Sequence, residues 1–237
     1  MARIFVTGDT HGDIDIAKIT TRGWVEQKNL TKDDYLIIVG DVAMRWFDTK
    51  PDGTLEGYDR NTIKWYENKS FTTLFVDGNH ENFNALNEYP VIEWHGGKVH
   101  KISDSIYHLM RGQVFTIDGK TFFTMGGATS VDRYQREENV SWWDAEMPSH
   151  AELEEGISNL EKHNMAVDYV ITHCCGTSLI PMLIGNGDSD TLTSFFDHLE
   201  FDFKLDFKHW YFGHYHQDKQ IDDKHTCLYN KVLLINS

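Results

Sequence analysis

Gly78-Asn79-His80-Glu81 follows the apolar run Thr73-Leu74-Phe75-Val76, and this stretch is the strongest indication of the fold. The run predicts a buried strand that ends in a turn. Polar side chains without helical periodicity then follow at the carboxyl end of the strand. In open α/β sheets this edge is where ligands bind. One strand end of this kind is weak support for a functional site, but four others carry similar side chains.

Four further apolar runs, at 3–7, 35–39, 169–172 and 208–212, also predict strands that end in polar residues. The residues at the five strand ends are Asp9-x-His11, Asp41, Asn79-His80, His173 and His214-x-His216. Taken singly, each favours an ordinary role as a turn residue, a helix cap or a satisfied core histidine. Five together, each directly after an apolar run, favour a functional site instead.

Length and composition predict a soluble globular protein. The 237 residues suit one large domain or two small ones, and the net charge of −15 argues against a basic face for long nucleic acid. The three cysteines, two of them adjacent, predict no disulfide framework and a reduced, cytoplasmic setting. Met1-Ala2-Arg3 leads directly into the first strand, and no apolar run reaches about 20 residues. We therefore expect neither a signal peptide nor a membrane span.

The periodicity between these runs predicts the remaining elements. Helices are expected from Ile16 to about Asn29, over 61–70, from Glu81 to Tyr89, from Ser149 with a capping box to Glu152, and over 192–199. A surface loop is expected over 48–60, short strands over 99–102 and 107–110, a hairpin through Asp118-Gly119, and a closing hairpin of 227–229 with 232–235. Strands and helices alternate first and a more antiparallel tail follows. This order predicts one α/β domain over 1–237 with mixed sheets.

The side chains at the strand ends agree in their chemistry. Imidazole, carboxylate and amide oxygen suit Mn, Fe, Co, Ni or Zn as divalent ions. Seven ligand-type residues are too many for one ion with open positions: Asp9, His11, Asp41, Asn79, His173, His214 and His216. They suit two ions that share one carboxylate. Paired ions of this kind lie about 3.5–4 Å apart and clamp the attacking and leaving oxygens of a phosphoryl displacement.

In this order the motifs resemble the calcineurin-like metallophosphoesterases over residues 9–216. The resemblance implies a four-layer α-β-β-α sandwich with two mixed sheets between helices. It implies Asp9, His11 and His216 on one metal, Asn79, His173 and His214 on the other, and Asp41 bridging both. It places His80 near the scissile phosphate without binding metal. Loop insertions are expected near 42–60, 82–112 and 128–148, where specificity is expected to lie.

Two segments set the chain apart within the family. Gly126-Gly127-Ala128-x-Ser130 and Trp142-Trp143 resemble bacterial and phage members. The protein Ser/Thr phosphatases have Gly-Asp-x-x-Asp-Arg-Gly, and here Arg45 keeps the phosphate-binding position while Met44 replaces the second Asp. His80 therefore loses its usual carboxylate partner, and a backbone carbonyl or a water is the expected substitute. This departure argues against the protein-phosphatase subfamily but not against phosphoesterase chemistry.

The expected reaction is hydrolysis of a phosphomonoester or phosphodiester by in-line attack of a hydroxide shared by two metals, with manganese as first choice. Arg45 and Asn79 are expected to contact substrate, and His80 to donate a proton or stabilise the transition state. A phosphorylated small molecule or nucleotide is the expected substrate, and the sequence leaves the oligomeric state open. Arg133 and Arg136 could meet a second phosphate, but the favoured interpretation is that they are solvated loop charges. The alternatives are a non-catalytic scaffold of this fold, which the filled ligand positions disfavour, and a nuclease acting on short or single-stranded ends.

Overall fold

The two faces of each central strand pack into different hydrophobic cores. The computed structural model describes residues 1–187 and 189–235. In β1 (Ile4–Thr7), Ile4 and Val6 face the core between the two sheets, whereas Phe5 faces the opposite side. Both faces of the strand are therefore buried, which explains why these segments are continuous apolar runs rather than alternating ones.

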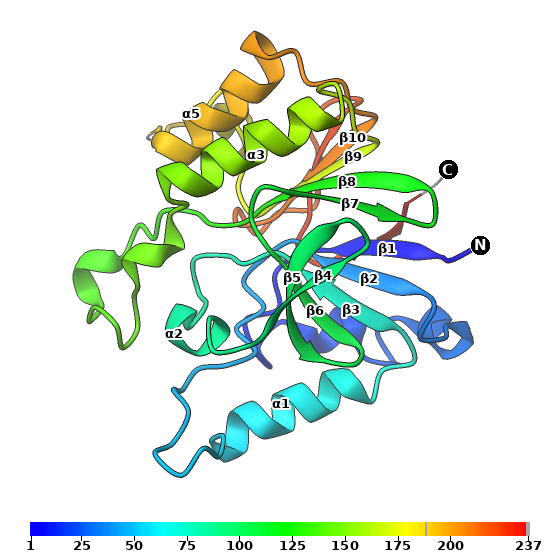
Figure 1. Ribbon diagram of the computed structural model, residues 1–237, viewed down its shortest axis with the longest axis vertical. Helices are drawn as coiled ribbons and strands as arrows, with labels where there is room; N and C mark the ends of the chain where they lie inside the picture. Colours follow the sequence, from blue (N-terminus) through cyan, green and yellow to red (C-terminus); the bar gives the residue numbers. More distant parts are fainter. Residues whose placement is uncertain (188, 236–237) are drawn as a thin grey trace.

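Two mixed sheets form the central layers (Figure 1). Within the described residues, the strand orders are β13-β1-β2-β3-β6-β5-β4 and β11-β12-β10-β9-β8-β7. The first sheet contains β1, β2 (Tyr35–Ile38), β3 (Thr72–Phe75), β4 (Val91–Trp94), β5 (Gly97–Ser103), β6 (Ile106–Leu109) and β13 (Val232–Leu234). The second contains β7 (Gln113–Ile117), β8 (Lys120–Met125), β9 (Tyr169–Thr172), β10 (His209–Phe212), β11 (Lys219–Gln220) and β12 (His225–Cys227). Each sheet has a parallel centre and antiparallel edges.

Helices cover the outer face of each sheet, and Figure 1 shows α3 and α5 above the second sheet and α1 below the first. The helices are α1 (Gly57–Glu67), α2 (Phe83–Leu86), α3 (His150–Lys162), α4 (Ile180–Ile184) and α5 (Thr191–Asp197). Shorter turns are η1 (Ile16–Ile19), η2 (Val25–Asn29), η3 (Arg133–Gln135), η4 (Asp144–Glu146) and the π-helical η5 (His198–Asp202). Leu160 of α3 packs with Phe123 in one outer core, and Tyr66 of α1 packs with Leu36 in the other. This arrangement confirms the four-layer α-β-β-α sandwich.

Local predictions hold where the turn chemistry is explicit. The β7–β8 hairpin turns at Asp118 and Gly119, which have φ of 48° and 77°. Ser149 and Glu152 form the capping box of α3.

All three cysteines are free and buried. None of the helices in the described residues combines the length and apolar character that crossing a bilayer requires.

Two predicted elements are wrong. The helix expected from Ile16 to Asn29 is broken into η1 and η2, and at Gly23 a Cβ would lie 2.1 Å from the Ala17 carbonyl oxygen. The closing hairpin does not form, because β12 pairs with β10 in one sheet and β13 pairs with β1 in the other. The amides of the crossing residues 229–231 donate to the Asp218 carboxylate instead.

The boundaries of other elements also differ from expectation. Helix α1 begins at Gly57, inside the expected loop 48–60, and edge strand β4 adds an element that the sequence did not predict. The single domain over 1–237 stays a prediction, and residues 188, 236 and 237 of it lie outside the described residues. The loops after β1, β2 and β3 meet those after β9 and β10, so the five polar strand ends converge.

Candidate metal centre

The loops after β1 and β10 bring three predicted ligands together. Asp9, His11 and His216 each offer one donor atom, and these atoms lie within 4.8 Å of one another. His216 Nε2 is 3.4 Å from Asp9 Oδ2, and the His11 and His216 rings meet edge to face with centroids 5.0 Å apart. These three side chains could hold one ion.

Asp41, which follows β2, lies between this group and a second one. Its Oδ2 is 3.2 Å from His11 Nε2 and 3.3 Å from His173 Nε2, and its Oδ1 accepts the His80 main-chain N–H at 2.7 Å. Burial opposes the ionisation of Asp41, but the neighbouring His173 and His11 outweigh it and hold the pKa of Asp41 well below its usual range. One oxygen atom thus faces ligands from both groups.

The second group contains Asn79, His173 and His214. Asn79 Oδ1 lies 3.2 Å from His173 Nε2, and the His214 ring meets the His173 ring edge to face at 5.1 Å. The His214 main-chain N–H also donates to Asp9 Oδ2 at 3.1 Å. Burial lowers the pKa of His214 to about 4, so its imidazole is neutral, the form that binds metals. The structure therefore brings all seven predicted ligands into one cluster.

Outer contacts orient these ligands. His173 Nδ1 lies 2.8 Å from the Val39 carbonyl oxygen, which only accepts, so that nitrogen carries the proton and Nε2 is left to face the cluster. His11 Nδ1 is held in the same way by Asp15 Oδ2 at 2.8 Å. The Asn79 amide nitrogen donates to Ser130 Oγ at 3.0 Å. Sequence reasoning missed Asp15 and Ser130, although Ser130 ends the glycine-rich motif.

Two glycines are required by the closeness of the loops. A Cβ at Gly78 would lie 2.1 Å from Asp41 Oδ1, and a Cβ at Gly213 would lie 2.1 Å from Asp9 Oδ1.

Four of the predicted ligands have left-handed backbone, with φ of 44° at His11, 46° at Asp41, 68° at His214 and 51° at His216. Such strain costs roughly 1–3 kcal/mol for each residue and is concentrated at functional sites.

Glu81 connects the two central loops of the cluster. Its carboxylate accepts the main-chain N–H groups of Val42 at 2.8 Å and Ala43 at 3.0 Å. Burial and the charge of Asp41 nevertheless raise the pKa of Glu81 to about 8. The last residue of the Gly78-Asn79-His80-Glu81 stretch thus holds the Asp41 loop, a role that the sequence did not reveal.

The charges of the cluster fit divalent cations. Asp9 and Asp41 are 0% and 1% exposed, and in the described part of the chain neither carboxylate forms an ion pair with a lysine or arginine. Burial disfavours a charged His173, yet Asp41 and Asp9 raise its pKa to about 10. Two buried carboxylates that attract positive charge this strongly, surrounded by imidazoles, are suited to binding metal ions.

Arg45 does not join the cluster. Its Nη1 lies 3.1 Å from Glu88 Oε2, and its Nη2 donates to the Phe47 carbonyl at 2.9 Å and to Thr49 Oγ1 at 3.1 Å. Its Nε faces Asp59 at 3.5 Å, and the residue is 5% exposed. Arg45 therefore organises its own loop and is not placed to meet a phosphate at the cluster, contrary to the expectation.

Arg136 is the cation that lies beside His80. Its Nη2 is 3.2 Å from His80 Nε2, and a guanidinium only donates, so this ring nitrogen accepts. Burial lowers the pKa of His80, and the Arg136 charge lowers it further against the opposing effect of Asp41. Met44 packs into an outer core at 3% exposure. The interpretation of Arg136 as a solvated loop charge is therefore wrong.

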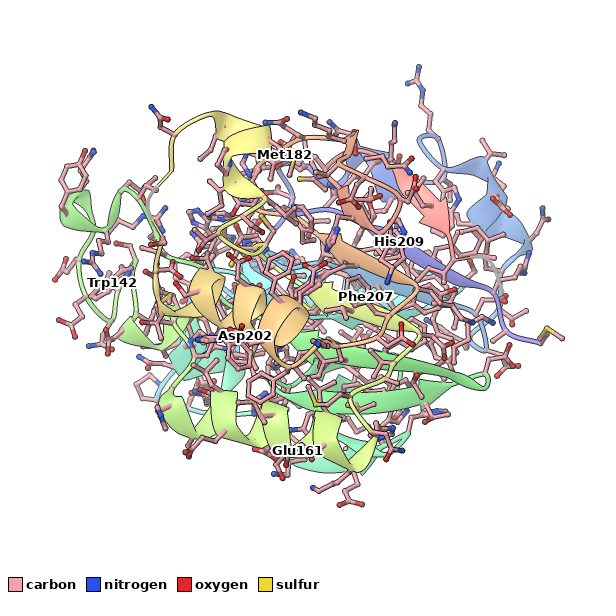
Figure 2. The ribbon with its side chains drawn as sticks, turned by 90° about the horizontal axis from the view of Figure 1, so that it is seen from above. Trp142, Glu161, Met182, Asp202, Phe207 and His209 are labelled. Carbon is pink, nitrogen blue, oxygen red and sulfur yellow. The ribbon has the colours of Figure 1, made fainter. Side chains whose placement is uncertain are left out.

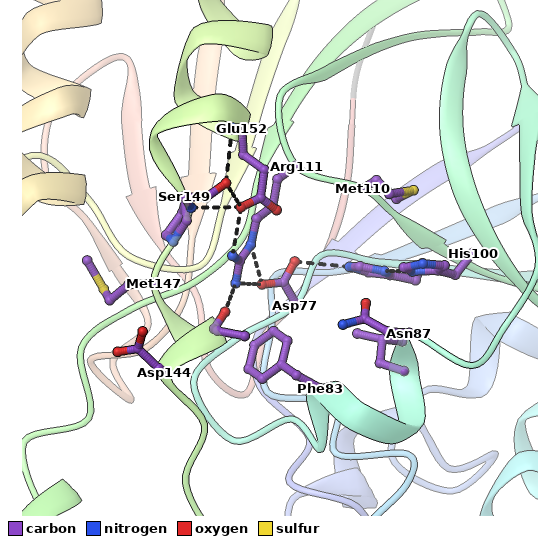
Figure 3. A pocket seen from close by; sticks show the side chains of 14 residues that line it. Asp77, Phe83, Asn87, His100, Met110, Arg111, Asp144, Met147, Ser149 and Glu152 are labelled. Carbon is purple, nitrogen blue, oxygen red and sulfur yellow. Dashed lines mark hydrogen bonds and ion pairs between the residues drawn. The ribbon is translucent and has the colours of Figure 1, made fainter. Parts of the chain in front are cut away.

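A cavity of about 500 Å³ lies next to the loop that carries Asn79 (Figure 3). In it, Asp77 accepts hydrogen bonds from Arg111 Nε at 2.9 Å and Nη2 at 2.6 Å, and His108 Nε2 lies 3.0 Å away. Arg111 also donates to the Ala145 carbonyl at 2.8 Å. Among the described residues, the lining of the cavity includes none of the seven predicted ligands. This network ties the end of β3 to the segment that carries Arg136.

The family comparison agrees with this geometry. The family model for calcineurin-like phosphoesterases matches residues 2–218, which include all five motifs. Among solved structures, the chain is similar to the phosphopantetheinyl hydrolase of Mycobacterium tuberculosis, with a TM-score of 0.45 and 14% identity over 96% of this chain and 88% of that one. A search of curated proteins gives no significant match.

Proposed function

We propose that this chain, which belongs to the calcineurin-like phosphoesterase family, uses two divalent ions at the seven-residue cluster to hydrolyse a phosphate ester. As a member of that family it is a metal-dependent phosphoric ester hydrolase. The observation that carries the two-ion proposal is the position of Asp41, whose Oδ2 lies 3.2 Å from His11 Nε2 and 3.3 Å from His173 Nε2. A carboxylate oxygen between two ligand groups supports a bridging role.

The assignment of ligands follows from the two groups. Asp9, His11 and His216 would hold one ion, Asn79, His173 and His214 the other, and Asp41 both. When bound, the ions activate water as a nucleophile and polarise the phosphoryl oxygens. The chain contributes the buried carboxylates, the imidazoles whose tautomers Val39 and Asp15 fix, and the loop held by Glu81. Manganese is the proposed metal, with Fe, Ni, Co and Zn as alternatives.

His80 is proposed to act on the substrate and not on the metal. Its main-chain N–H is held by Asp41, which places its ring beside the cluster. From there the imidazole would contact the phosphoryl group and, in its protonated form, pass a proton to the leaving oxygen. Asn79 is proposed to contact the substrate as well. Arg45 is not among these residues, because its guanidinium is bound within its own loop.

The substrate is proposed to be a phosphorylated small molecule or a nucleotide. The net charge of −15 disfavours long nucleic acid, so nuclease action on short or single-stranded ends is the weaker alternative. A non-catalytic scaffold is disfavoured because the cluster retains a complete set of ligand-type side chains together with His80. A cytoplasmic location remains a prediction.

The test is a panel of phosphomonoesters, phosphodiesters and nucleotides, assayed on metal-stripped protein with Mn, Ni, Fe or Zn added back. We expect hydrolysis of at least one class that depends on the added metal, and none by Asp41→Asn. Protein that binds two equivalents of metal but hydrolyses no ester of the panel would favour the scaffold alternative.

A further inference from the structure

We infer that Arg136 binds the phosphoryl group of the substrate and gives the site a preference for phosphomonoesters over phosphodiesters. This inference rests on the proposed function, since it places the phosphate at the metal centre. Arg136 follows η3 in the segment 128–148, which also carries Trp142 and extends at one side of the molecule (Figure 2). Its Nη2 is 3.2 Å from His80 Nε2, and a ring nitrogen of His80 lies within 4.8 Å of donor atoms of His11 and Asp41.

Hydrogen bonds to Asp132 hold the Arg136 guanidinium in place. Asp132 Oδ2 accepts from Arg136 Nε at 3.0 Å and from Nη2 at 2.8 Å, and the side chain of Arg136 is 16% exposed. Nη1 donates to the Ser141 carbonyl at 3.4 Å, which is long for a hydrogen bond. Of the five N–H groups of an arginine, one on Nη1 has no partner among the described residues. The group is therefore both pre-oriented and able to take a further acceptor.

His80 is a weak acceptor for this guanidinium. A hydrogen bond from arginine to a phosphoryl oxygen is charge-assisted and roughly twice as strong as one to a neutral acceptor. An incoming phosphate oxygen would therefore replace His80 as the partner of Arg136 and leave the imidazole free to face the same phosphoryl group.

Other cations near the cluster are committed elsewhere. The Lys18 ammonium donates to the main-chain carbonyls of Asp9 and Tyr229. Arg45 is bound within its loop, as described above. Arg136 is thus the basic side chain in the described residues that adjoins His80 with a donor to spare.

The preference for monoesters follows from charge. A phosphomonoester carries up to two negative charges near neutral pH, whereas a diester carries one. The attraction to a fixed guanidinium grows with that charge. Removing Arg136 should therefore harm monoester hydrolysis more than diester hydrolysis.

The test compares Arg136→Ala with Arg133→Ala in the metal-loaded protein. Arg133 lies in the same turn and is exposed, which makes it a matched control. We expect Arg136→Ala to lower kcat/KM for a phosphomonoester by about 10–100-fold, the range of one lost charged hydrogen bond, with a smaller loss for a diester. Calorimetry should show weaker binding of inorganic phosphate, and metal stoichiometry should stay unchanged. Arg136→Lys should restore part of the loss, because it keeps the charge without the planar fork.

Each outcome separates this inference from the function on which it rests. Phosphate affinity and kcat/KM equal to those of Arg133→Ala would overturn the phosphate contact. Equal losses on monoesters and diesters would overturn the preference. Loss of metal would show that Arg136 supports the structure of the metal centre and would overturn the phosphate contact as the cause of the lost activity. A wild-type protein that hydrolyses nothing, but whose phosphate binding still depends on Arg136, would support the contact while contradicting the proposed function.

Discussion

The Asn79 side-chain amide donates to Ser130 Oγ at 3.0 Å, which leaves its oxygen facing His173 Nε2 at 3.2 Å. Ser130 is itself fixed, since its main-chain N–H donates to Glu146 Oε1 at 3.0 Å and the residue is 2% exposed. The glycine-rich motif that ends at Ser130 thereby determines which atom of Asn79 points at the proposed metal. Ser130 is a positioning residue in this account.

Ser130→Ala should weaken binding at the ion held by Asn79, His173 and His214. Loss of a contact that orients a ligand typically lowers metal affinity roughly 10–100-fold. Metal titration by calorimetry should show one weakened site and one unchanged. Ser141→Ala is the control, because that exposed hydroxyl bonds the Glu137 main chain away from Asn79. Identical isotherms for the two variants would remove Ser130 from the metal centre.

Asp41→Asn should weaken both sites, because its Oδ2 faces His11 and His173 from the two groups. Asp9→Asn should weaken mainly the site of His11 and His216, since its Oδ2 lies 3.4 Å from His216 Nε2. Elemental analysis after dialysis against low metal concentrations measures both effects. Equal, mild losses in the two variants would contradict the bridge.

His80→Ala should keep its metal and lose turnover, since His80 is proposed to act on the substrate. Loss of a general acid typically costs about 10²–10⁴-fold in rate. The loss should be larger for an alkyl phosphate than for a nitrophenyl phosphate, whose leaving group needs little protonation. A rate on the alkyl ester equal to that of wild type would exclude His80 from the chemistry.

Much of the fold and the cluster could be predicted because buried parallel strands leave a direct signature. The apolar runs predicted β1, β2, β3, β9 and β10, and the polar residues that follow these strands converge in the seven-residue cluster. The closing hairpin failed because local turn signals cannot show that β12 and β13 belong to different sheets.

The surroundings of the cluster depend on contacts between residues that are distant in sequence. Arg45 lies four residues after the predicted ligand Asp41, but its guanidinium pairs with Glu88 and not with the cluster. Arg136 contacts His80 although the two residues are 56 positions apart. The local sequence does not predict the orientation of either arginine side chain. Ser130 was missed for the same reason, since only the folded chain sets it beside Asn79, 51 positions away. Asp15 is different, because it lies four positions after His11 and its contact with that residue is local.

Asp34 should make stability depend on pH in acid. Burial opposes its ionisation, but hydrogen bonds from Arg3 and Thr31 outweigh this and lower the pKa of Asp34 to about 2. Its contribution is therefore present above the unfolded-state pKa of about 3.9 and is lost as pH falls toward 2. Because water screens the partly exposed Arg3, we expect Asp34→Asn to cost about 1 kcal/mol at pH 7.

Urea unfolding at pH 7, 4 and 2.5 measures this difference, with the exposed neighbour variant Asp33→Asn as control. The gap between wild type and Asp34→Asn should narrow as pH falls. A gap that stays constant over this range would show that the Arg3–Asp34 pair does not produce the acid sensitivity.

The number of metal ions bound per chain tests the central claim most directly. Stripped protein is saturated with Mn²⁺, passed through a desalting column and examined by elemental analysis alongside Asp41→Asn. The seven-residue cluster predicts a wild-type value that approaches two equivalents, and a lower value for the variant. A wild-type value of one that persists at excess metal would contradict the two-ion centre.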